Sequence, residues 1–147
     1  MKKLLAGILV AGLLAGLAGL VAGGRGHAPA LQVADAWIKQ LPPVIRVRAG
    51  YARIRNDDDR PHRLVGARSP DFERIEMHRT LLQDGHMKMV RAEAFEVPPH
   101  GELALAPGGR HLMMFSPRRP LPAGTEVPVT LRFADGSEVE VRFRVRP

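Results

Sequence analysis

Histidine and methionine are concentrated in one part of this sequence. Residues 76–115 contain five of the six methionines and four of the six histidines, and the chain of 147 residues has no cysteine. Thioether and imidazole ligands without clustered carboxylates suit Cu(I) far better than magnesium, calcium or manganese. A blue-copper electron-transfer centre needs a cysteine thiolate, so the composition excludes that class. Methionine forms no disulfide and needs no deprotonation, which suits a copper site outside the cytoplasm.

Strand geometry determines which of these side chains can meet, because alternate residues of a strand face the same way. This rule selects one histidine from a first strand, one methionine from a second, and an i, i+2 histidine-methionine pair from a third. The predicted metal ligands are His78, Met89, His111 and Met113. We expect them to converge at one end of the sheet and to bind Cu(I).

The same alternation assigns the other histidines and methionines. The methionines that face away from the predicted site are expected in the core, namely Met77 and Met114. Met87 is intermediate, either lining the site or serving as a substitute ligand. The remaining histidines are expected to be exposed to solvent: His27, His62, His86 and His100.

Glu76 precedes His78 on the same strand face and has two possible roles. Its carboxylate could fix the tautomer of the imidazole from the side away from the metal, or it could be an ordinary surface carboxylate. The sequence leaves both possibilities open. Arg110, next to His111, is expected to be a surface charge.

The elements that must position these residues are β-strands. Apolar and polar residues alternate after residue 30, and no helical period appears. The clearest case is a hairpin, with residues 127–133 and 139–146 alternating around an Asp-Gly turn. Further strands are expected at 31–39, 49–55, 62–68, 73–79, 86–97, 102–106 and 110–115. Many short strands joined by Gly and Pro turns predict an all-β, antiparallel sandwich or barrel.

The N-terminal segment reads as an export signal, because Lys2 and Lys3 precede an uncharged run over residues 4–22. We expect residues 1–23 to be a signal peptide or a retained membrane anchor, 24–30 a short linker, and 31–147 a single copper-binding domain outside the cytoplasm. Without residues 1–23 the chain keeps 20 basic and 15 acidic residues. The basic residues are scattered singly along strands, so nucleic-acid binding has little support.

The spacing of the four predicted ligands resembles a known signature. Ten residues separate His78 from Met89, and twenty-one separate Met89 from the His-Leu-Met sequence that starts at His111. This matches the H(M)X10MX21HXM motif of the PCuAC family of periplasmic copper chaperones. Similarity extends to DAW at 35–37, RLVGARSP at 63–70 and PGGRHLMMF at 107–115.

The resemblance implies a cupredoxin-like β-sandwich or barrel whose Cu(I) ligands are His78, Met89, His111 and Met113. It also implies that the domain lies in the periplasm and delivers copper to the CuA subunit of cytochrome c oxidase, directly or through a thioredoxin-like assembly protein. Some members carry a His/Met-rich C-terminal tail that takes a second copper, and this sequence shows none, so we expect one copper ion per chain. Two rival functions remain at this point. A copper-buffering or tolerance protein would use the same site without a specific acceptor, and a metal-free β-sandwich adaptor would need no convergence of the four residues. No nucleophile, base and orienting group occur together near the His/Met group, so an enzyme is not expected.

Overall fold

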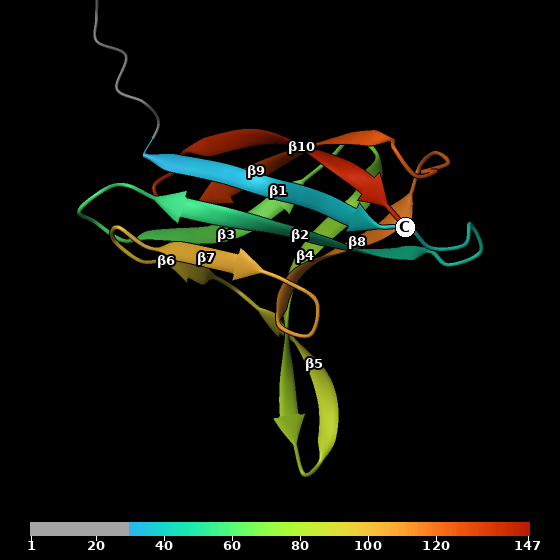
Figure 1. Cartoon of the computed structure of the whole chain (residues 1–147), viewed down its shortest axis with the longest axis horizontal. Helices are drawn as coiled ribbons and strands as arrows, with labels where there is room; N and C mark the ends of the chain where they lie inside the picture. The colour runs from blue at the N-terminus through green and yellow to red at the C-terminus, as the bar shows by residue number, and fades with distance from the viewer. Residues whose placement is uncertain (1–29) are drawn as a thin grey trace, which may run out of the picture.

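The computed structural model describes residues 30–147. The regular secondary structure of this range consists of β-strands (Figure 1). The strands are β1 Leu31–Lys39, β2 Val47–Asn56, β3 His62–Arg68, β4 Phe72–Gln83, β5 His86–Ala92, β6 Phe95–Val97, β7 Glu102–Leu105, β8 Arg110–Pro117, β9 Glu126–Phe133 and β10 Glu138–Arg146. The expected signal or anchor (1–23) and nearly all of the expected linker lie outside the described residues. No helix in residues 30–147 is long and apolar enough to cross a membrane.

The sheet closes on itself to form a barrel. Neighbouring strands follow the order β4-β8-β2-β1-β10-β9-β3, and β3 returns to β4 through the pair Ala67 and Ile75. All pairings are antiparallel except the one between β1 and β10. β5 pairs with β4 alone and projects with it as a hairpin away from the other strands (Figure 1). The predicted all-β fold class is confirmed.

The alternation seen in the sequence builds the barrel core. In β9 the side chains of Val127, Val129, Leu131 and Phe133 are buried, while the neighbouring polar residues are wholly or partly accessible to solvent. β10 contributes Phe143 and Val145 in the same way. Met77 and Met114 are 4% and 0% exposed, so their predicted place in the core is confirmed. The residues that flank them in β4 and β8 therefore point to the outer face of the barrel.

Several strands begin or end one to four residues from the expected positions, and two of the differences matter for the site. β4 continues beyond residue 79 to Gln83 because Asp84 and Gly85 both have positive φ (51° and 76°), which allows a tight two-residue turn into β5. The prediction of a single strand over residues 86–97 was wrong. It divides after Ala92, because Phe95 leaves the hairpin, is buried in the core and pairs with Leu64 of β3.

Candidate metal centre

His78 and His111 lie opposite each other on adjacent strands. β4 and β8 pair so that His78 is the partner of His111 and Glu76 is the partner of Met113. Because directly opposed residues point to the same face of a sheet, the two imidazoles meet, with their ring centroids 5.9 Å apart. The strand register thus pairs two histidines that have thirty-two residues between them in the sequence.

Each imidazole uses one nitrogen for a hydrogen bond within the protein and leaves the other free. Nε2–H of His78 donates to Oε2 of Glu76 at 2.9 Å, and Nδ1–H of His111 donates to the carbonyl oxygen of Gly109 at 3.2 Å. The remaining atoms, Nδ1 of His78 and Nε2 of His111, are buried and have no hydrogen-bond partner among the described residues. Leaving a buried acceptor unsatisfied costs about 1–3 kcal/mol. Two lone pairs at facing imidazoles are therefore available to a metal ion.

The two predicted methionines lie on the same strand face as the histidines but differ in exposure. Met113 is two residues from His111, sits opposite Glu76 and is half-buried. Met89 is opposite Thr80 on the projecting hairpin, one diagonal step from His78, and is 58% exposed. Diagonal neighbours are within reach of long side chains. The structure thus brings His78, His111 and Met113 together on the barrel wall and leaves Met89 on the open side.

Glu76 contacts His78 directly, which favours the positioning role over the surface role. Its side chain is 20% exposed and also accepts a hydrogen bond from Nε of Arg74 at 3.3 Å. The hydrogen bond from His78, followed by that from Arg74, lowers the pKa of the Glu76 carboxyl. An ionised carboxylate at this position holds the proton of His78 on Nε2, so that Nδ1 remains an acceptor.

Burial controls the protonation of His111. The residue is 3% exposed. Burial, with a smaller contribution from the nearby His78, lowers the pKa of His111. The neutral imidazole required of a metal ligand is therefore the stable form at neutral pH.

Two aromatic rings border the imidazoles, and one of them was missed by the sequence reasoning. Phe115 lies four residues from His111 in β8 and therefore on the same strand face, and its ring centroid is 6.4 Å from that of His78. Tyr51 of β2 lies 6.5 Å from His111 and stacks on Trp37 at 4.7 Å. Only the register between β2 and β8 reveals Tyr51, because Gly50 pairs with Leu112. Tyr51 thus lies beside His111 and Phe115 beside His78.

The other histidine and methionine predictions have mixed outcomes. His86 and His100 are exposed as predicted, and Met87 is 65% exposed on the hairpin. The predicted exposure of His62 was wrong, because its side chain is only 13% exposed and lies between Asp58 (Nε2 to Oδ2, 3.1 Å) and Asp135. His27 lies outside the described residues. Arg110 is a surface charge, as expected.

The side chains near the two imidazoles restrict which kind of metal ion the site can bind. Within residues 30–147, no group of three or more His, Cys, Asp or Glu side chains is arranged to hold a metal ion. Further donors beside His78 and His111 are available in the thioethers of Met113 and Met89, which share their strand face. Soft, neutral donors of this kind favour Cu(I) over hard divalent cations.

Comparison with known proteins gives the family and the fold. The family model described as "Putative lipoprotein LpqE-like" matches residues 31–145. A protein of Leifsonia xyli subsp. xyli, named a "Putative lipoprotein", is 33% identical over 156 positions that cover 98% of this chain and 90% of the relative.

Solved structures of PCuAC domains superpose on the barrel. The copper-bound PCuAC domain of PmoF2 aligns with a TM-score of 0.68 and 26% identity, covering 80% of this chain and 92% of that domain. The Cu(I) form of DR1885 from Deinococcus radiodurans aligns with a TM-score of 0.61 and 31% identity, covering 84% and 83%. The chain therefore belongs to the LpqE-like family and has the cupredoxin-like fold of PCuAC domains.

Proposed function

We propose that this protein is a copper chaperone that binds one Cu(I) ion through His78, Met89, His111 and Met113 and passes it to an acceptor protein. The observation that carries the proposal is the pair of buried, unpartnered imidazole nitrogens on facing residues of β4 and β8. The copper-bound forms of the similar PCuAC domains support the choice of metal. No catalytic step is proposed, because copper is the cargo and leaves unchanged.

The residues around the histidines are suited to hold a monovalent soft cation. Glu76 and the carbonyl of Gly109 fix which nitrogen of each imidazole is free before the metal arrives. Neutral imidazoles and thioethers bind a metal ion without losing a proton. The nearby carboxylate of Glu76 compensates the positive charge of the bound Cu(I) ion.

Release is proposed to begin on the open side of the site. Met89 is 58% exposed on a hairpin that projects from the barrel, whereas His111 is 3% exposed. A thioether is also a weaker donor than an imidazole. The acceptor's ligands would therefore displace Met89 first and the histidines last.

The proposed acceptor is the CuA subunit of cytochrome c oxidase, or a thioredoxin-like protein that assembles it, in the periplasm. The lipoprotein names of the family and of its relative support an exported, envelope-associated protein. A strain lacking this protein should lose oxidase activity and keep normal copper tolerance. Normal oxidase activity with copper sensitivity would instead support the buffering function and refute delivery.

A transfer assay tests the delivery step directly. The Cu(I)-loaded domain is mixed with an apo CuA domain, and formation of the binuclear centre is followed by its visible absorption. Met89→Leu should speed copper transfer to the acceptor, because the bond between the metal and its weakest proposed ligand is already missing. His111→Ala should load no copper to transfer. Unchanged loading and delivery by both variants would contradict the proposed site.

A further inference from the structure

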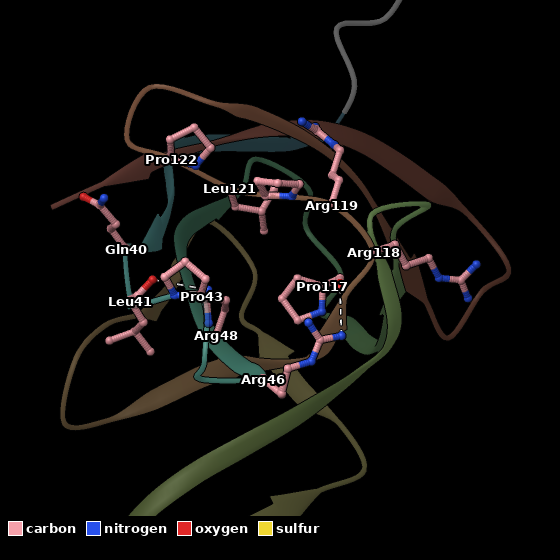
Figure 2. Close-up of a pocket in the computed structure, with 11 residues that line it drawn as sticks. Gln40, Leu41, Pro43, Arg46, Arg48, Pro117, Arg118, Arg119, Leu121 and Pro122 are labelled. Carbon is pink, nitrogen blue, oxygen red and sulfur yellow. Dashed lines mark hydrogen bonds between the residues drawn. The ribbon is translucent and has the colours of Figure 1, made fainter.

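A second concave site lies at the opposite end of β8 from the histidines. The cavity has a volume of about 510 Å³ and is bordered by the loop between β1 and β2 and by the loop between β8 and β9 (Figure 2). His111 is near the start of β8, and Pro117 at its end borders the cavity. Six strand residues span roughly 20 Å, so the cavity is separate from the metal centre. Its volume is within the range of pockets that bind small organic ligands, about 300–1,000 Å³.

The cavity carries positive charge without acidic residues. Four of its lining residues are arginines and none is Asp or Glu. The charge of Arg119 is already neutralised, because its guanidinium forms a two-bond ion pair with Asp71 at 2.8 Å. Arg46 and Arg48 have no carboxylate within 4.0 Å among the described residues, and Arg118 extends away from the cavity (Figure 2). Arg46 and Arg48 therefore provide the uncompensated charge.

Arg48 is an unusual residue, because its side chain is buried without a counter-ion. It is 4% exposed, and its terminal nitrogens donate to the carbonyl oxygens of Leu41, Ile45 and Val47. Its Nε is buried and has no hydrogen-bond partner among residues 30–147. Burial, followed by the charge of Arg46, lowers the pKa of Arg48. In the part of the chain that the structure describes, the three carbonyls satisfy the terminal nitrogens but leave the charge without a counter-ion and Nε without an acceptor. Burying a charge without a counter-ion is costly, so an anion bound beside Arg48 would be stabilised.

The rest of the lining is apolar. Leu41 and Pro43 come from one loop and Leu121 and Pro122 from the other (Figure 2). Val44, next to Pro43 in the same loop, is 79% exposed. A ligand that carried only charge would leave these surfaces unused, and a wholly apolar ligand would leave the cations unpaired.

We propose that this cavity binds a small free carboxylate with an apolar body, such as a medium-chain fatty acid. The carboxylate would pair with Arg46 and Arg48, since a guanidinium matches the two oxygens of a carboxylate. The apolar chain would lie between the leucines and prolines of the two loops. This function is independent of copper.

Isothermal titration calorimetry of the copper-free domain with octanoate tests the proposal. We expect saturable one-to-one binding, with no saturable binding of acetate, inorganic phosphate or octanol over the same concentrations. Equal binding of octanol would show an apolar pocket only, and equal binding of acetate or phosphate would show a simple anion site. Either result overturns the proposal. Binding to anionic lipid vesicles, but not to octanoate, would show a membrane-docking surface and would overturn it as well.

Three variants locate the binding. Arg48→Gln removes the buried cation but also frees three backbone carbonyls. Arg46→Gln frees only the carbonyl of Pro117, to which Nη2 of Arg46 donates at 3.0 Å, so it is the decisive change. Losing one charge-assisted hydrogen bond should weaken octanoate binding about tenfold to a hundredfold. Arg118→Gln, which makes the same change in net charge at the rim, should alter it less than about twofold. Equal effects of the Arg46 and Arg118 changes, or no effect of either, would refute the site, and Cu(I) binding should be unchanged in both.

Discussion

Met113 and Met114 are neighbours in the sequence, yet replacing each by alanine should impair a different property of the protein. Met114 is 0% exposed, and its terminal methyl and sulfur lie against Gly50 beside the ring of Phe143. Met113 points the other way, to the outer face that carries the imidazoles. Met114→Ala should therefore reduce stability, and Met113→Ala should reduce copper binding.

The size of the stability loss follows from the packing around Met114. Replacing a buried methionine by alanine costs about 2–5 kcal/mol. Gly50 has no side chain that could fill the vacated space, so we expect about 3 kcal/mol. A domain of about 120 residues has an unfolding entropy of about 0.25 kcal/mol/K, and the expected fall in Tm is about 12 °C. Met113→Ala should cost less than about 1 kcal/mol, as is usual for residues outside the core.

Thermal unfolding followed by circular dichroism, with Cu(I) competition against a chromophoric chelator, checks both effects. Met114→Leu is the matched control, because a volume-conserving change costs less than about 1.5 kcal/mol. Below its Tm, Met114→Ala should bind copper like the native domain, and Met113→Ala should bind it at least about tenfold more weakly, in line with the loss of one ligand. If the two alanine variants lost similar stability, or if Met114→Ala weakened copper binding as much as Met113→Ala, the assignment of faces would be wrong.

Three further predictions concern the surroundings of the site. Glu76→Gln should weaken Cu(I) binding about 10-fold to 100-fold by competition titration, because His78 loses its orienting carboxylate; an unchanged affinity would make Glu76 a surface residue. Burial lowers the pKa of His111 in the folded domain. As the pH falls below about 6.5, the imidazole of His111 therefore becomes protonated in the unfolded chain before it does so in the folded one, and the apo domain should lose stability. Urea unfolding at pH 7 and pH 5 measures this loss, which should be smaller in His111→Asn. Met87→Leu should leave both Tm and equilibrium Cu(I) affinity unchanged, and a tenfold loss of affinity would make Met87 a ligand.

Strand alternation was sufficient to predict much of the site from the sequence. It separated Met77 and Met114, which are buried, from the histidines and Met113, which share the outer face. Local periodicity carries this information, because the side-chain direction in a strand repeats every two residues. The hairpin of β9 and β10 was predictable for the same reason, since the Asp-Gly turn fixes which residues pair.

The features that the sequence did not reveal depend on contacts between distant segments. Tyr51 reaches His111 only through the register of β2 and β8, and His62 is covered by Asp58 and the distant Asp135. The strand expected over 86–97 divides because Phe95 is buried in the core, where it pairs with β3. Such outcomes are decided by tertiary packing, which local pattern does not determine.

The central claim is that two facing imidazoles and their neighbouring thioethers form one Cu(I) site. The most direct test is a Cu(I) titration against a chromophoric chelator, comparing the native domain with a variant in which all four residues, His78, Met89, His111 and Met113, are replaced. The native domain should withdraw one equivalent of Cu(I) from the chelator. The variant, once circular dichroism has shown that it is folded, should withdraw none. Equal competition by the two proteins would contradict the account.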